Sequence, residues 1–597
     1  MSAFTNTKQT SEAIEARVDE LLNQMTLPEK VGQMTQVEKN SITLAEVIEY
    51  GIGSVLSGGG GNPIPNTPQT WAQMVRPFQE AALRTKLGIP LLYGVDAVHG
   101  HSNVRGATIF PHNIGLGATR DVELVKQVAH ITAREMLATN VHWSFAPSVC
   151  VPQDIRWGRT YEGFSENTEL VTSLGAAFIQ GLQNSESIRP VLASVKHFVA
   201  DGGTKWDTTS QYPWIPDWWQ SENPEKWKID QGNAVLDESV LRDVHLPPYE
   251  AAIAAGARNI MVSYSSWNGL KMHAHRYLLM DVLKGEMGFD GFLISDWLAV
   301  DQLDLDFDTC VILAINAGLD MIMVPYDYKR FINSVMSAVE NGSISSSRID
   351  DAVRRILRVK IEIGLFEEPF GNESLLAHVG CSEHRQVARE AVRKSQVLLK
   401  NGSQTLPLSR HASRILVAGK GANDIGLQCG GWTIEWQGQS GAITPGTTLF
   451  DAVSDIVSDE TIVEYDVNGW FEYRDTNAEI GLIVLGELPY TEGEGDRSEL
   501  NLLVEDIAIV KRMRPLCEKL VIVLYSGRPL LINDVIETCD AFVAAWLPGT
   551  EAQGIADVLF GDYPFTGKLA YTWPSSMRQI QHKNEEQNSL FPYGYGV

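Results

Sequence analysis

The sequence of 597 residues lacks any run of about 20 apolar residues, the length that a membrane-spanning helix needs. Basic side chains are also scarce, since 48 Lys and Arg face 74 Asp and Glu and leave a formal net charge of −26. This charge repels phosphates and argues against a nucleic-acid partner. Neutral ligands such as sugars are compatible with it. We therefore predict a globular protein with neither a membrane span nor a nucleic-acid ligand.

A signal peptide is missing as well. Residues 1–17 show no basic region followed by an apolar stretch. Two localisations are compatible with this N-terminus: a cytoplasmic protein, or a secreted or periplasmic protein whose leader has been removed. The oligomeric state stays open.

Motifs for metals, redox chemistry and nucleotides are not found. The six cysteines lie far apart without a CxxC pair, which favours scattered buried thiols. There is no HExxH motif and no carboxylate cluster, so we expect neither a metal nor another cofactor. The run Ser57–Gly61 (SGGGG) lacks the Lys-Ser/Thr of a phosphate loop, and no strand leads into GxGxxG and a helix. Dinucleotide binding is therefore excluded.

The length of the chain exceeds what one hydrophobic core usually supports, so at least two domains are expected. Up to residue 365, short β-branched runs alternate with helical stretches, as in parallel βαβ units. We predict a (β/α)8 TIM-like barrel over residues 1–365, a linker over 366–383 and a doubly wound α/β sandwich domain over 384–597. The predicted barrel strands are Ile52–Leu56, Ile89–Gly94, Val141–Phe145, Leu192–Phe198, Asn259–Tyr264, Phe292–Ser295 and Asp320–Val324.

Several of these apolar strands end in a polar or charged residue. The endings are Asp96 after LLYGV, Lys196 and His197 after LASV, Tyr264 after MVS and Asp296 after FLIS. One such ending means little, because Asp begins many turns. In a (β/α)8 barrel, however, the C-terminal strand ends converge on the active site. Their shared position predicts a common site.

Asp296 is followed by Trp297 in the segment GFLISDW. An aromatic ring beside a carboxylate can stack on the apolar face of a sugar while the acid reaches the anomeric carbon. Glycoside hydrolysis needs one carboxylate as nucleophile or base and another as proton donor. The alternative is a structural Asp that caps a helix.

Motifs along nearly the whole chain, in order, resemble those of glycoside hydrolase family 3, and within it the two-domain β-glucan exohydrolases of plants and bacteria. Besides GFLISDW, they are YGVDAVHGH (Tyr93–His101), RWGRTYEGFSE (Arg156–Glu166), KHFVADGGT (Lys196–Thr204), VSYSSWNG (Val262–Gly269), GGWTIEWQG (Gly430–Gly438), GELPYTEGEGD (Gly486–Asp496) and the terminal FPYGYGV.

The resemblance implies a retaining exo-β-glucosidase or exo-β-glucanase that acts on β-linked glucosides and gluco-oligosaccharides. It implies Asp296 as the nucleophile and Glu492 of the second domain as the acid/base, with the two carboxyls about 5–5.5 Å apart as retention requires. Side chains implied to bind the substrate's glucosyl unit are Asp96, Arg159, Lys196, His197, Tyr264 and Met323. Those implied to clamp the next sugar are Trp297 and Trp436, with Trp432 nearby.

Three other acids near Glu492 compete for its role: Glu494, Asp496 and Glu499. The chain also departs from the family pattern in two places. Leu298 follows SDW where the plant enzymes usually have an acidic residue. Two local disulfides of those enzymes do not carry over, since Cys150 and Cys517 have no partner in the sequence.

A segment longer than is usual in the family follows KHFVADGGT, from Lys205 to Asp230. It holds five of the fifteen tryptophans: Trp206, Trp214, Trp218, Trp219 and Trp227. Because it would leave a barrel strand at the site-facing end, these rings could extend the sugar-binding platform. They could equally fold the insert onto the barrel as a small satellite core.

Other functions were compared with this interpretation. An N-acetylglucosaminidase would carry a His–Asp dyad in a KHFPGHG-type motif, whereas here Asp207 is followed by threonines. β-Xylosidase or arabinosidase activity stays open, because one hydroxymethyl group is worth only about 1–3 kcal/mol in such a pocket. A non-catalytic sugar-binding protein would be expected to have lost one carboxylate, and both are present.

Overall fold

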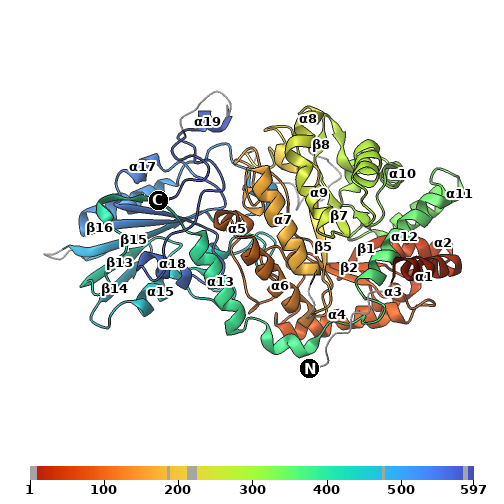
Figure 1. Cartoon of the computed structure of the whole chain (residues 1–597), viewed down its shortest axis with the longest axis horizontal. Helices are drawn as coiled ribbons and strands as arrows, with labels where there is room; N and C mark the ends of the chain where they lie inside the picture. Colours follow the sequence, from red (N-terminus) through yellow and green to blue (C-terminus); the bar gives the residue numbers. More distant parts are fainter. Residues whose placement is uncertain (1–9, 185–187, 211–224, 473–476, 582–588) are drawn as a thin grey trace.

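Short apolar runs, buried on both faces, form the strands of the first of two α/β units. The computed structural model describes residues 10–184, 188–210, 225–472, 477–581 and 589–597. The two units lie side by side along the longest axis of the molecule, with the barrel coloured red to green and the second unit teal to blue (Figure 1). The middle of the insert, residues 211–224 with Trp214, Trp218 and Trp219, lies outside the described residues.

Eight strands of the first unit form one parallel sheet in the order β10-β7-β5-β4-β3-β2-β1-β11. A bridge between Ile294 and Met321 joins the two outer strands, so the sheet closes into a barrel. The strands are β1 (Thr35–Glu38), β2 (Ser54–Ser57), β3 (Leu92–Val95), β4 (Trp143–Ser144), β5 (Leu192–Phe198), β7 (Asn259–Val262), β10 (Phe292–Ile294) and β11 (Ile322–Met323). The predicted (β/α)8 barrel is confirmed, and β1 adds a strand that the sequence patterns did not indicate.

Aromatic side chains fill the barrel interior. The Trp143 ring packs edge-on against Phe145 and Phe292, with ring centroids 5.2 and 5.4 Å away. Gly94 makes room for them, since a Cβ there would lie 2.4 Å from the Phe145 ring. The barrel is thus a packed core whose open end carries the loops.

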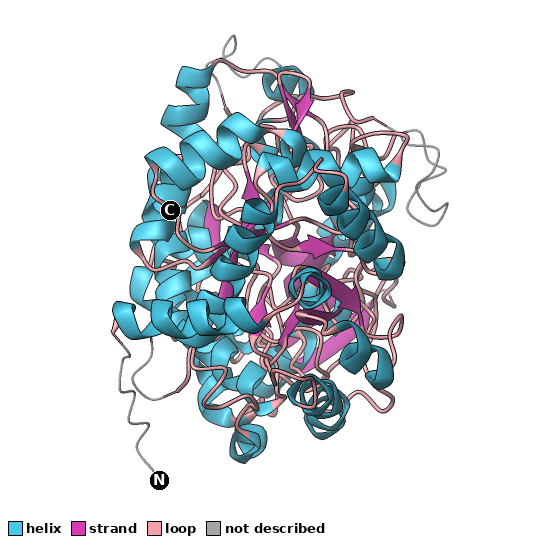
Figure 2. Cartoon of the chain, turned by 90° about the vertical axis from the view of Figure 1, so that its right-hand side faces the viewer, coloured by secondary structure: helices cyan, strands magenta, loops and turns pink. Residues whose placement is uncertain are grey.

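Helices surround the strands, as the side view in Figure 2 shows. Those of the first unit are α1 (Ser11–Gln24), α2 (Leu27–Gln33), α3 (Leu44–Tyr50), α4 (Pro68–Leu83), α5 (Asn113–Thr119), α6 (Val122–Ala138), α7 (Thr168–Gln183), α8 (Glu238–Val240), α9 (Pro247–Ala254), α10 (Phe307–Ala317), α11 (Tyr328–Glu340) and α12 (Ser346–Glu362). None of the helices in the described ranges is long and apolar enough to cross a membrane.

The second unit is built on a six-stranded sheet in the order β12-β17-β16-β15-β13-β14, parallel except for β12. Its strands are β12 (Val397–Asn401), β13 (Arg414–Ala418), β14 (Ile462–Asp466), β15 (Ala478–Gly486), β16 (Cys517–Tyr525) and β17 (Ala541–Trp546). Alternate side chains of β16 enter different apolar clusters, Val521 and Val523 in one and Leu520 and Ile522 in the other. Both faces of this sheet are therefore covered, as a doubly wound sheet requires.

The helices of the second unit are α13 (Ser382–Ser395), α14 (Ile425–Cys429), α15 (Leu449–Ile456), α16 (Val504–Met513), α17 (Asn533–Ile536), α18 (Gln553–Leu559) and α19 (Met577–Gln581). Helix α13 lies between the units in Figure 1 and contacts both α6 and α18. The domain limits at residues 365 and 384 stay a prediction.

Candidate active site

A cavity of about 470 Å³ opens where the C-terminal ends of the barrel strands face the second unit. All eleven side chains singled out from the sequence line it: Asp96, Arg159, Lys196, His197, Tyr264, Asp296, Trp297, Met323, Trp432, Trp436 and Glu492. The ends of β3, β5, β7, β10 and β11 supply the barrel members except Arg159, which lies on the loop after β4. The prediction that these endings share one site agrees with this placement.

Asp296 lies two residues beyond β10 and is 9% exposed. Its Oδ1 accepts the backbone N–H of Trp297 at 2.7 Å, and its own N–H donates to His273 Nε2 at 3.1 Å. His197 Nε2 lies 3.5 Å from Oδ2. Burial raises the pKa of Asp296 to about 6, against the opposing charges of Arg159 and Lys196. Asp296 is therefore an ionised carboxylate above that pH, with Oδ2 beside the His197 ring.

Two residues of β5 lie beside Asp296. The Lys196 ammonium pairs with Asp96 Oδ1 at 3.1 Å. His197 Nδ1 lies 2.9 Å from Asp201 Oδ2, and burial lowers the pKa of His197 well below its usual value. A neutral His197 oriented by Asp201 can hydrogen-bond a sugar hydroxyl, while Asp96 supplies a charged acceptor.

Glu492 comes from the second unit, on the loop that follows β15, and begins the short 3-10 helix η10 (Glu492–Gly495). Arg159 of the barrel donates to Glu492 Oε1 at 3.3 Å and is held by Glu162 through two bonds of 2.8 and 2.9 Å. Burial raises the pKa of Glu492 well above its usual value, with Arg159 opposing and the carboxylates of Asp230 and Asp296 adding to the rise. Such a group holds a proton that it can donate.

Aromatic rings form the walls of the cavity. The Tyr264 hydroxyl donates to the Trp297 carbonyl and so fixes the start of the loop that carries this ring. Trp432 lies over the Lys196 ammonium at 5.4 Å and over the Arg159 guanidinium at 5.8 Å. Trp297 and Trp436, the pair predicted to clamp the next sugar, also line the cavity and are partly exposed.

The glycine run Gly58–Gly61 has a structural explanation. A Cβ on Gly59 would lie 2.6 Å from Cβ of Trp436, and one on Gly58 would lie 3.2 Å from the Trp297 ring. Side chains at these positions would displace the two tryptophans. The run is therefore a place where the barrel approaches the loop of the second unit too closely for any side chain.

Buried histidines of the barrel hold that loop in place. His99 Nε2 lies 3.0 Å from Thr433 Oγ1, and His112 Nε2 lies 3.0 Å from the Gly431 carbonyl. The Ile434 N–H donates to the Ser102 carbonyl at 2.8 Å. The motif YGVDAVHGH thus contains both Asp96, which lines the cavity, and His99, which contacts the loop of Trp432 and Trp436.

The three acids that competed with Glu492 have other places. Glu494 accepts the indole N–H of Trp227 at 2.9 Å. Asp496 is buried and accepts four backbone N–H groups. Glu499 is exposed. Glu492 is the one of these four carboxyls that lines the cavity.

Sequence reasoning did not single out several residues of the site. Among them are Glu162, Asp201 and His273, which contact the predicted residues, and Glu38, Asn40, Phe145, Met261 and Tyr326, which line the cavity. Glu162 and Asp201 belong to motifs quoted above, so their signal was present in RWGRTYEGFSE and KHFVADGG.

The two described tryptophans of the insert, Trp206 and Trp227, have different surroundings, and each matches one of the two hypotheses. Trp206 covers the Arg156 guanidinium at 4.5 Å and packs against a small cluster that includes Trp157 and Ile229, so it belongs to a satellite core. Trp227 instead packs with Tyr264 against the clamp. The six cysteines, all within the described residues, are free thiols.

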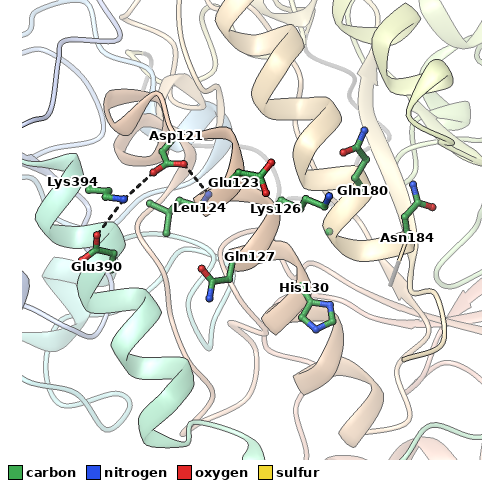
Figure 3. A pocket seen from close by; sticks show the side chains of 11 residues that line it. Asp121, Glu123, Leu124, Lys126, Gln127, His130, Gln180, Asn184, Glu390 and Lys394 are labelled. Carbon is green, nitrogen blue, oxygen red and sulfur yellow. Dashed lines mark hydrogen bonds and ion pairs between the residues drawn. The ribbon is translucent and has the colours of Figure 1, made fainter. Parts of the chain in front are cut away.

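A second hollow of about 620 Å³ lies between α6, α7 and α13 (Figure 3). Lys394 of α13 pairs across the gap with Asp121 at 2.9 Å and, within its own helix, with Glu390 at 3.2 Å. It is open to solvent and gathers none of the acids or rings discussed above. The cavity at the barrel mouth is the better candidate for catalysis.

Comparisons with known proteins agree with this geometry. Residues 26–223 and 227–359 match the model of the glycosyl hydrolase family 3 N terminal domain, and residues 396–597 match that of its C-terminal domain. The lysosomal beta glucosidase of Dictyostelium discoideum is 30% identical over 642 residues, covering 97% of this chain and 75% of that protein.

Two solved structures are similar as well. A mutant of the exo-1,3/1,4-beta-glucanase from a Pseudoalteromonas species superposes with a TM-score of 0.90 at 40% identity, covering 100% of this chain and 97% of that one. The beta-glucosidase from Listeria innocua, in complex with glucose, gives a TM-score of 0.82 at 27% identity and covers 98% and 83%.

Proposed function

Because this chain belongs to glycoside hydrolase family 3 and is an exo-acting β-glucosidase of the glucanase type, we propose that it retains the anomeric configuration, with Asp296 as the nucleophile and Glu492 as the acid/base. One observation carries the assignment. The two carboxyls reach the same cavity from different units, and Trp297 and Trp436 line it with them.

In the first step Asp296 Oδ2 attacks the anomeric carbon of the terminal glucosyl unit while Glu492 protonates the departing oxygen. The bond to the leaving group breaks, and a glucosyl ester forms on Asp296. Oδ1 keeps its hydrogen bond from the Trp297 N–H, so the carboxylate stays oriented during the attack. With a pKa of about 6, Asp296 is mostly ionised near neutral pH, because Arg159 and Lys196 oppose the effect of burial. Burial raises the pKa of Glu492 and so favours its protonated form.

In the second step Glu492, now an anion, removes a proton from a water molecule that attacks the same carbon. Glucose leaves, and both carboxyls return to their starting states. Arg159 lies 3.3 Å from Glu492 Oε1 and stabilises the anion between the steps. Asp96, Lys196 and His197 bind the hydroxyls of the glucosyl unit, so substrates enter from their non-reducing end.

Product analysis tests this function. Incubation with β-1,2, β-1,3, β-1,4 and β-1,6 glucose disaccharides and with laminarin is expected to release glucose, first as the β-anomer in proton NMR. Release of the α-anomer first would contradict retention. A nitrophenyl β-xyloside belongs in the same panel, and faster turnover of it than of the glucoside would favour a β-xylosidase.

The pH profile should report the two carboxyls. Asp296 must be ionised to attack, and its pKa is raised to about 6, so kcat/KM is expected to fall tenfold per pH unit below about pH 6. Glu492 must be protonated, and its pKa is raised well above the usual value, so activity declines only on the alkaline side. The check is kcat/KM for laminaribiose across pH. Full activity persisting at pH 4 would refute the role given to Asp296.

A further inference from the structure

The loop that carries Glu492 is contacted by the last part of the tryptophan-rich insert, residues 226–230. The Trp227 backbone N–H donates to the Gly493 carbonyl at 3.0 Å, and its indole N–H donates to Glu494 Oε1 at 2.9 Å. The Lys226 ammonium donates to the Glu494 carbonyl. These bonds join a barrel insert to residues that directly follow Glu492 in sequence.

Asp496 ties the same two segments together from the other direction. Its Oδ1 accepts the backbone N–H of Gly158 at 2.8 Å. Its Oδ2 accepts three successive backbone N–H groups at 2.8, 2.8 and 3.0 Å, those of Lys228, Ile229 and Asp230. Because this buried carboxyl group accepts four backbone N–H groups of the barrel, it fixes the Glu492 loop to the barrel at several points.

Trp227 also reaches the aromatic walls of the site. It is 9% exposed and forms one apolar cluster with Tyr264, against which Trp297 and Trp436 pack. A Cβ on Gly493 would lie 2.2 Å from its ring, so the ring lies directly on the backbone of the acid/base loop. One side chain thus contacts both the clamp and the loop.

The backbone of Glu492 needs such support. Its φ of 51° lies in the left-handed region, which non-glycine residues seldom adopt. A conformation of this kind persists only where the surrounding structure holds it. From the second unit itself, the buried Arg528 guanidinium donates to the Gly495 carbonyl at 2.6 Å and to the Arg156 carbonyl at 2.9 Å. From the barrel, residues 226–230 supply further contacts.

We propose that residues 226–230 form a strap that positions Glu492 for proton transfer, and that Trp227 is its positioning residue. The proposal rests on the acid/base role given to Glu492 above. Because the ring of Trp227 also packs against the clamp, the strap couples the leaving-group subsite to the proton donor. Part of the insert then serves catalysis, in addition to the satellite core around Trp206.

The test compares two substrates that differ in their need for a proton. Laminaribiose must be protonated as it leaves, whereas 2,4-dinitrophenyl β-glucoside has a leaving group that departs as an anion. Trp227→Ala is expected to lower kcat/KM for laminaribiose about 10- to 100-fold, within the range that general acid catalysis supplies, and that for the activated glucoside less than about threefold. Trp227→Phe keeps a ring on the loop and should recover most of the loss.

Trp206→Ala is the matched control, because it removes a tryptophan from the same insert and leaves the loop contacts intact. It should change neither kcat/KM value. Equal losses on both substrates in Trp227→Ala, with an unchanged inhibition constant for glucose, would overturn the strap. If Trp227→Ala does not fold, Trp227→Leu decides, because it removes the ring and keeps an apolar side chain: a loss confined to laminaribiose supports the proposal, and a uniform loss or none overturns it.

Glu492→Gln is measured in parallel. If kcat/KM of this variant falls equally for both substrates, the acid/base assignment itself fails and the strap has no proton donor to position. If Glu492→Gln separates the substrates and Trp227→Ala does not, the strap alone is wrong.

Discussion

Replacing Asp296 by Asn is expected to lower kcat/KM for all β-glucosides by about 10⁴-fold or more, equivalent to about 5.4 kcal/mol of transition-state stabilisation. The amide has nearly the shape of the carboxylate but is a poor nucleophile, so the glucosyl ester cannot form at a useful rate. Unlike loss of the proton donor, this loss should not depend on the leaving group. The measurement is kcat/KM for laminaribiose and for 2,4-dinitrophenyl β-glucoside.

The control for this variant is binding. Asp96, Lys196 and His197 remain in place in Asp296→Asn, so glucose should still protect the protein against thermal unfolding, with a dissociation constant within about tenfold of the parent value. Removal of one negative charge from the pocket is the only intended change. Activity that survives in this variant would overturn the mechanism, whatever the binding result.

Replacing Glu492 by Gln is expected to lower kcat/KM for laminaribiose by about 10²- to 10⁴-fold, the usual contribution of a general acid. For the dinitrophenyl glucoside kcat/KM should change less than about tenfold, because its first step needs no proton. The second step would then become limiting, since no base activates water. Added azide, which needs no base, should raise kcat and give a β-glucosyl azide.

The matched control is Glu494→Gln, two residues away on the same loop. Its carboxylate accepts the Trp227 indole N–H, and the amide oxygen of Gln can accept it too. Azide should therefore have no effect on this variant. A response to azide in Glu494→Gln and not in Glu492→Gln would exchange the roles of the two residues.

The barrel and its strand-end residues could be predicted because each rests on a local pattern. The run FLIS followed by Asp296 gives a buried strand and then a polar side chain, and closure of the barrel brings such endings together. The apolar runs Ile415–Ala418, Ile480–Leu485, Leu520–Leu524 and Ala541–Trp546 predict the inner strands of the second sheet in the same way. The two edge strands, β12 and β14, were missed; β14 is only partly buried, so its sequence carries a weaker apolar pattern.

The strap could not be predicted, because its contacts join residues more than 260 positions apart. Nothing in the insert's sequence indicates that Trp227 packs on Gly493 while Trp206 packs on the barrel. The reason for the glycine run Gly58–Gly61 was likewise not predictable, since it depends on the approach of Trp436 from the other unit. Local patterns place strands, whereas docking between units decides which side chains meet.

Arg528 connects these observations to the way the chain is made. Its guanidinium is fully buried and donates to carbonyls of both the barrel and the acid/base loop, so those bonds form only when the second unit packs on the barrel. The barrel is synthesised first, and domains generally fold as units during synthesis. With the roles proposed above, a nascent chain with a complete barrel holds the nucleophile but lacks the proton donor. Hydrolytic activity is then expected only after the final assembly step, so the appearance of turnover during refolding should report docking of the two units rather than folding of either one.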